Sequence, residues 1–175
     1  YFLHEEYREA LRWLNRLLQI PTSDLRQNLQ DFARIFQMIL HYELGNRDLI
    51  EYLFRSAYRY YRGKPGKENT APRIRLHEFE QILFQAMREV TFRGANLETL
   101  APEMYEKLWA LARNADGKEP AGLYEIIFWV QSKVEQVGLK VIYKKRVVAR
   151  TQLVDEKEKG ADEATIRALE ERETE

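Results

Sequence analysis

Apolar side chains recur at alternating spacings of three and four residues along most of this chain. Such spacing places the apolar side chains on one face of a helix and leaves the polar side chains on the other. In the segment that ends near Glu43, the repeating residues are Leu25, Leu29, Phe32, Phe36 and Ile39. The same pattern predicts helices over residues 3–19, 25–43, 48–61, 76–91, 102–112, 123–134 and 139–150.

Residues 32–61 carry the densest run of apolar and aromatic side chains, and their pattern predicts two helices folded back on each other. Gly45 suits the left-handed backbone conformation that ends a helix, and Asn46 or Asp48 is able to cap the helix that follows. This second helix is apolar or aromatic around most of its circumference. We therefore expect it to pack on two sides, with its tyrosines mainly in the core.

The pattern changes toward the C-terminus. Residues 139–150, LKVIYKKRVVAR, contain enough β-branched side chains to suit a helix or a strand, and the helical neighbours favour a helix. From Asp155 onward the sizeable apolar residues are only Ile166 and Leu169, which predicts a frayed tail with a short helix near residues 163–172.

Two segments rich in proline, glycine and charge interrupt the helical pattern, at residues 63–73 and 114–122. They are short enough to be loops inside one domain. We therefore expect a single helical-repeat domain over residues 1–150 and a charged C-terminal tail over residues 151–175, flexible or partly helical.

The charge composition narrows the possible functions. The 175 residues contain 28 Lys and Arg against 28 Asp and Glu, so no global field draws the molecule onto nucleic acid or an anionic membrane. The absence of cysteine excludes disulfides, thiolate metal sites and cysteine nucleophiles.

With no apolar run of about 18 residues and no signal-like start, we expect no membrane contact and a cytoplasmic location. The chain begins at Tyr1 rather than Met, which is compatible with a fragment of a longer protein.

The residue types used in catalysis and metal binding form no recognisable motif. His4, His41 and His77 are far apart and fit neither HxxxH nor HExxH spacing. Glutamate pairs such as Glu103 with Glu106 lack the histidine spacing of a di-iron site and suit solvated helix faces. We therefore expect that the protein has no catalytic residues, binds no metal or cofactor, and is not an enzyme. Acids and histidines that converge only in the folded chain leave an enzyme open as a third possibility.

Two basic clusters are the candidate partner-binding residues. Arg55, Arg59 and Arg62 recur at spacings of four and three and share one helix face, and Lys64 extends their charge. Interleaved tyrosines, if exposed, add the stacking surfaces that single-stranded nucleic-acid sites use. We favour the other interpretation, in which the tyrosines are core and the arginines pair with acids on the helix surface.

The second cluster lies near the C-terminus, ahead of the acidic tail. Tail and cluster are able to pair within one molecule or across two, and the oligomeric state stays open. The cluster consists of Lys140, Lys144, Lys145, Arg146 and Arg150.

The hairpin HYELGNRDLIEYLFRSAYRY resembles a tetratricopeptide-type (TPR) unit. Met38 and Ile50 stand where the TPR consensus has small residues, so the unit is described as TPR-like. The residues that fit the consensus order of tyrosine, turn glycine, aspartate, aromatic and alanine are Tyr42, Gly45, Asp48, Phe54 and Ala57.

A longer resemblance covers about residues 25–137. The ELGN turn, IEYLFRSAYRYYRGK, LHEFEQILFQAMR and YEIIFWVQSKVE are similar to segments in the C-terminal portion of long bacterial helical-repeat proteins of unassigned function. This resemblance implies a fold and carries no catalytic motif. The matching residues are Glu51, Tyr52, Arg55, Ser56, Tyr58, Arg59, Phe79, Glu80, Ile127, Trp129, Ser132 and Lys133.

Pattern and resemblance together predict an all-α fold of about six to seven helices, arranged as the stacked antiparallel helical hairpins of a TPR-like α-solenoid. The leading hypothesis is a non-enzymatic interaction or scaffold module that binds a protein or peptide partner. The alternative is a nucleic-acid-binding helical domain that uses the face of Arg55, Arg59 and Arg62.

Overall fold

The computed structural model describes residues 1–20, 27–62, 76–115, 119–158 and 163–174. The protein is all-α: these residues form eight α-helices and a short 3-10 helix, and none of them lies in a strand. The elements are η1 (Phe2–His4), α1 (Tyr7–Gln19), α2 (Gln27–Glu43), α3 (Arg47–Arg62), α4 (Glu78–Arg93), α5 (Leu97–Arg113), α6 (Leu123–Glu135), α7 (Leu139–Glu158) and α8 (Glu163–Thr174).

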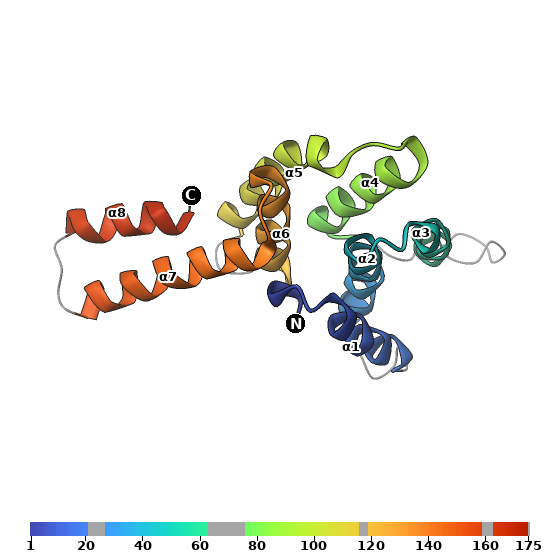
Figure 1. Cartoon of the computed structure of the whole chain (residues 1–175), viewed down its shortest axis with the longest axis horizontal. Helices are drawn as coiled ribbons and strands as arrows, with labels where there is room; N and C mark the ends of the chain where they lie inside the picture. The colour runs from blue at the N-terminus through green and yellow to red at the C-terminus, as the bar shows by residue number, and fades with distance from the viewer. Residues whose placement is uncertain (21–26, 63–75, 116–118, 159–162, 175) are drawn as a thin grey trace.

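Helices that follow one another in the sequence pack against one another, and α2 also contacts α4. The N-terminal residues lie beside the C-terminal part of the chain, because η1 contacts α7. Figure 1 shows α1, α2 and α3 on one side, α4, α5 and α6 beside them, and α7 with α8 extending outward as a hairpin. Within that hairpin, α8 packs against α7.

The core runs through the middle of the molecule, where α2, α4, α5 and α6 bury their apolar stripes. Trp129 on α6 is fully buried. Met38 and Ile50, which depart from the TPR consensus, are also buried. The largest other fully buried side chains are Ile35, Ile39, Leu40, Leu83, Met87, Leu97, Leu108, Leu123, Ile126 and Ile127.

The turn between α2 and α3 has the predicted geometry. Gly45 adopts φ 73°, its N–H donates to the carbonyl of Tyr42 at 3.0 Å, and the Asn46 N–H donates to the carbonyl of His41 at 2.9 Å. This pair of bonds closes the end of α2 around a left-handed residue. The Asn46 side-chain amide lies 3.2 Å from His41 Nδ1. The hairpin predicted for residues 32–61 is confirmed.

Helix α3 packs against α2 and α4, as expected, but it does not bury all of its aromatic side chains. Phe54 and Tyr61 are buried, and the Tyr61 hydroxyl donates to the carbonyl of Asp31 at 2.8 Å. Tyr52 and Tyr58 are exposed. The expectation of mainly core tyrosines is therefore wrong for these two, because the aromatic surface of α3 is wider than the faces that α2 and α4 cover.

Helix α5 begins earlier than predicted. The sequence predicted a start near Pro102, whereas the helix starts at Leu97, and the Asn96 side chain accepts a hydrogen bond from the Glu98 N–H at 3.2 Å. Asparagine is a strong N-cap residue. Leu97 and Ala101 are buried, so the additional turn gains apolar burial and holds the proline within the helix.

Residues 139–150 form a helix, which resolves the choice between helix and strand. Helix α7 continues to Glu158, so residue 150, proposed as the end of the domain, lies inside one continuous helix. Leu153 beyond that point is buried. Helix α8 confirms the short helix predicted near residues 163–172, and it packs against α7.

A largely buried carboxylate joins α2 to α6. Glu43 Oε1 accepts a hydrogen bond from the indole N–H of Trp129 at 2.7 Å and lies 2.7 Å from the ammonium nitrogen of Lys133. The Lys133 and Glu43 side chains are only 19% and 10% exposed. One oxygen thus satisfies two donors that lie 86 and 90 residues further along the chain.

Replacing Glu43 by Ala should lower the free energy of unfolding by about 3 kcal/mol, because it leaves a buried indole N–H and a largely buried ammonium without their acceptor. Glu43→Gln keeps an oxygen acceptor and should cost about 1 kcal/mol. Urea unfolding measures both losses. Glu103→Ala, which removes an exposed partner of Lys107, is the matched control and should leave the midpoint unchanged. Equal losses for the two Glu43 variants would contradict the proposed role of the oxygen.

Gly122 lies directly before α6, at a point where the backbone comes close to Phe32 of α2. Its φ is 88°, and a Cβ added there would lie 2.7 Å from the ring of Phe32, which stacks on Phe36 and also contacts Phe79 at a tilt of 45°. Gly122→Ala should therefore lower the free energy of unfolding by about 2–3 kcal/mol. Gly45→Ala is the control, because φ there is 73° with no atom within 4 Å of the added Cβ. The Gly45→Ala substitution should lower the free energy of unfolding by about 1 kcal/mol. Thermal unfolding measures the loss in both glycine variants.

Candidate functional site

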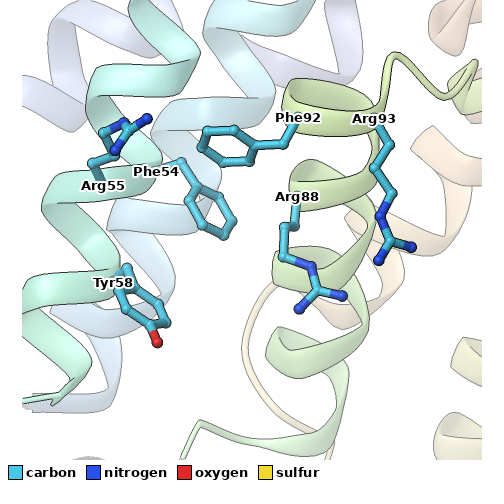
Figure 2. Close-up of a pocket in the computed structure, with 6 residues that line it drawn as sticks. All are labelled: Phe54, Arg55, Tyr58, Arg88, Phe92 and Arg93. Atoms are coloured by element: carbon cyan, nitrogen blue, oxygen red, sulfur yellow. The ribbon is translucent and has the colours of Figure 1, made fainter.

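A surface groove between α3 and α4 brings Arg55, one of the predicted binding residues, together with aromatic side chains. Its volume is about 420 Å³, within the range of ligand sites. We call it the α3–α4 groove (Figure 2). It is lined by Phe54, Arg55 and Tyr58 from α3 and by Arg88, Phe92 and Arg93 from α4.

Aromatic rings form the floor of the α3–α4 groove. Phe54 is 6% exposed and stacks on Phe84 with a centroid distance of 4.3 Å. Its ring meets Phe92 edge to face at 5.2 Å, and Figure 2 shows these two side chains pointing toward each other from the two helices. Phe92 and Tyr58 are 44% and 45% exposed. The groove therefore has a fixed aromatic base and two aromatic surfaces open to solvent.

Arginines surround this aromatic floor. The guanidinium carbon of Arg55 lies 5.5 Å from the centre of the Phe92 ring, a distance suited to cation–π attraction. Arg55 also pairs with Glu51 at 2.7 Å, and both side chains are more than half exposed. On the opposite wall, Arg88 and Arg93 share the carboxylate of Glu89 at 3.0 and 2.9 Å. Hydrogen bonds from Arg88, and the nearby charge of Arg93, hold the pKa of Glu89 below its usual value.

The structure describes the positions of only two side chains of the first predicted cluster, those of Arg55 and Arg59. Arg55 lines the α3–α4 groove, and Arg59 lies exposed one turn further along α3, with its Nε–H donating to the carbonyl of Arg55 at 3.3 Å. The side chain of Arg62 and the whole of Lys64 lie outside the described residues. The arginines of α4 were not singled out from the sequence, although Arg88 and Phe92 have the spacing of neighbours on one helical face.

The second predicted cluster does not form one surface. Lys140 and Lys144 are exposed on α7, while Lys145 pairs with Glu135 at 3.0 Å. Arg146 is buried, and its guanidinium donates to Gln131 Oε1 at 2.9 Å. The guanidinium carbon also lies 5.8 Å from the ring centre of Trp109 and 5.7 Å from that of Phe128. Arg146 is therefore a packing residue between α7, α6 and α5.

A second hollow of about 290 Å³ lies between α4 and α5. It is less aromatic than the α3–α4 groove, and Glu89, which lines it, pairs with Arg88 and Arg93 of that groove. Its lining residues are Ile82, Gln85, Ala86, Glu89, Leu100, Glu103, Met104 and Lys107.

The three histidines have separate neighbours, and His77 lies beside one buried acid, Glu80. His41 is buried beside Asn46, and burial lowers the pKa of its imidazole. His4 meets the ring of Tyr143, and His77 lies just before α4. Within the described ranges, no group of three or more His, Asp or Glu side chains is placed to hold a metal ion. No helix in the described part of the chain is long and apolar enough to cross a membrane.

Scans against family models, curated proteins and solved structures found no match to this chain. Its site is therefore interpreted from its own geometry.

One buried carboxylate near the start of α4 yields a pH prediction. Glu80 is buried, and its Oε2 accepts a hydrogen bond from the His77 N–H at 2.7 Å. Burial raises the pKa of this carboxyl above its usual 4.5, opposed by the His77 hydrogen bond and reinforced by the nearby charge of Asp31. The folded protein therefore binds this proton more tightly than the unfolded chain does.

Glu80→Gln should consequently be more stable than the parent protein at neutral pH, because it removes the cost of burying the charge while keeping the oxygen that caps His77. The stability difference should disappear below about pH 4.5 and grow as the pH rises through the raised pKa. Thermal unfolding between pH 4 and pH 8 measures it. Glu78→Gln, an exposed change in the same helical turn, is the control and should show no such trend. A difference that stays constant with pH would contradict this assignment.

Proposed function

We propose that this protein is a non-enzymatic protein-interaction module, built from TPR-like helical hairpins, whose binding surface is the α3–α4 groove. The observation that carries the proposal is the combination of exposed aromatic rings with arginines over a rigid aromatic floor. Aromatic residues and arginine are the types enriched at protein interfaces and at their energetic hot spots.

The packing of the hairpins supports the proposed architecture. Consecutive helices pack against one another, and the α2–α3 turn has the left-handed glycine that a TPR-like unit requires. Two residues on which the longer resemblance rests, Trp129 and Lys133, both contact Glu43 of the ELGN turn. The separate segments of the resemblance are thus joined by one interaction.

The chemistry of the groove walls supports binding rather than a structural role. Exposed ion pairs such as Arg55–Glu51 contribute only about 0–1 kcal/mol, so the fold does not depend on them. Phe92 and Tyr58 keep nearly half of their surfaces in water, although both lie beside apolar neighbours. A partner that covers these rings gains apolar burial without unfolding any helix.

Nucleic-acid binding is the second candidate, because Arg55, Arg59 and exposed Tyr58 lie within two turns of α3. Rings of this kind stack on bases, and arginines contact phosphates. Glu51 and Glu89 oppose it, since both carboxylates lie within ion-pair distance of groove arginines and would repel a phosphate backbone.

The proposal is tested by selecting peptides from a displayed random library on the immobilised protein, and then measuring the binding of synthetic peptides. We expect selected peptides to bind in the micromolar range. Phe92→Ala and Tyr58→Ala should each weaken binding about tenfold, the loss typical of an interface hot spot. Trp13→Ala removes an equally exposed ring on α1 and is the matched control.

Failure to enrich any peptide, or peptides whose affinity is unchanged by both groove variants, would contradict the proposal. Binding of a single-stranded RNA oligonucleotide that weakens steeply with salt and is lost in Arg55→Glu/Arg59→Glu would favour the second candidate.

A further inference from the structure

We propose that the α3–α4 groove recognises an acidic peptide segment carrying an aromatic side chain, whose carboxylates replace Glu51 and Glu89 as partners of the groove arginines. This inference rests on the proposed function and specifies its ligand. It assigns Glu51 and Glu89 the role of internal competitors that hold the arginines while the groove is empty.

The charges at the groove favour an anionic partner. Three guanidinium groups, those of Arg55, Arg88 and Arg93, line it, and two carboxylates pair with them. Glu89 is shared between two arginines, so among the described residues its single negative charge balances only one of the two guanidinium charges. Arg59, next to Arg55 on α3, adds to this excess.

The guanidinium group is suited to a carboxylate ligand in particular. Its planar array of N–H donors matches the two oxygens of a carboxylate and allows two parallel hydrogen bonds. The Arg55–Glu51 contact already uses both Nε and Nη2 on the same oxygen, at 2.9 and 2.7 Å. A peptide carboxylate would meet donors whose position is set by the helix and by the nearby Phe92 ring.

The positions of the side chains predict how such a peptide lies. Figure 2 shows Arg55 and Phe92 at one end of the groove, Tyr58 and Arg88 at the other, and Phe54 between them. An aromatic side chain placed over Phe54 would contact the exposed rings of Phe92 and Tyr58. Acidic residues on either side of it would then reach Arg55 and Arg88. The recognised pattern is an aromatic residue flanked by acids.

The exchange of partners is accessible because the arginines are exposed. The Arg55, Arg88 and Arg93 side chains are 64%, 47% and 71% exposed, whereas Glu51 and Glu89 are 52% and 15% exposed. The Arg55–Glu51 pair is therefore weak and screened by solvent. An incoming carboxylate therefore meets arginines that are positioned but not tightly held, and the competing glutamates lower its affinity.

This chemistry favours a peptide over a nucleic acid. A phosphate backbone needs a row of cations, whereas the arginines of the groove are paired with the carboxylates of Glu51 and Glu89. The hollow of about 420 Å³ is of the size that encloses a few side chains. An acidic peptide needs only the two ends of this groove and its aromatic floor.

The test uses three fluorescein-labelled heptapeptides: Glu-Asp-Glu-Phe-Glu-Asp-Glu, the same peptide with Gln and Asn in place of the acids, and the acidic peptide with Ala in place of Phe. Fluorescence polarisation with the full chain in 100 mM salt gives the affinities. We expect the acidic Phe peptide to bind, and the amide and Ala peptides to bind at least about tenfold more weakly.

The decisive variant removes a competing carboxylate. Glu89→Gln should tighten binding of the acidic Phe peptide about three- to tenfold, because Arg88 and Arg93 lose their shared negative partner. Glu9→Gln, which removes the carboxylate partner of Arg12 on α1, is the matched control and should leave the affinity unchanged. Arg88→Ala should weaken binding at least about fivefold, and Arg88→Lys should give an intermediate loss, because lysine keeps the charge without the planar donors. Far-UV circular dichroism verifies that each variant remains folded.

Weaker or unchanged binding in Glu89→Gln would overturn the inference, as would equal binding of the acidic and amide peptides. Such results leave the proposed function standing if peptides selected from the displayed library still bind the groove. A U12 RNA that binds more tightly than the acidic Phe peptide at the same salt overturns the choice of a peptide. Failure of every displayed peptide to bind removes the proposed function itself.

Discussion

The carboxylate of Glu43 is the interaction on which the arrangement of this molecule depends most. It lies at the end of α2, directly before the turn into α3, and it accepts a hydrogen bond from Trp129 and pairs with Lys133 of α6. A carboxylate with so little exposure is tolerated only when its oxygens are paired. The turn that ends α2 and the buried face of α6 must therefore be placed together.

This placement determines which helices are central and which are peripheral. Helix α2 is covered by α1, α3 and α4 and is anchored to α6, so its apolar stripe is buried on several sides. In the described part of the chain, helix α3 packs mainly against α2 and α4 and keeps an exposed aromatic face. The α3–α4 groove lies at this edge, and the stack of Phe54 on Phe84 connects its floor to the core. Its base is packed against the core, while its walls carry exposed side chains.

The sequence was sufficient for the features that depend on neighbouring residues. Apolar periodicity located the helices, and Gly45 located the turn between α2 and α3, because both signals are local. The start of α5 was misplaced because Pro102 resembles a first-turn residue, whereas the cap at Asn96 and the burial of Leu97 outweigh that signal.

Features that depend on residues far apart in the sequence could not be predicted from local sequence patterns. The sequence singled out Arg55 but not Arg88 or Phe92, which reach the same groove from the next helix, beyond residues 63–75. Arginine is usually found at the protein surface. Arg146 is nevertheless buried against Gln131 and Trp109, which come from two other helices. Periodicity within one helix specifies a face, and only packing specifies what that face meets.

The balance of charge suggests how recognition at this groove would operate. With a formal net charge of zero, the molecule exerts no long-range attraction on an acidic partner. Selectivity of the proposed site would then come from groups that act at contact distance, and Glu51 and Glu89 pair with the arginines of the groove. Internal carboxylates keep the arginines positioned and reduce their attraction for anions in general. A partner gains by supplying both a ring for the aromatic floor and carboxylates for the arginines, and the requirement for both together is what would distinguish it from other acidic chains.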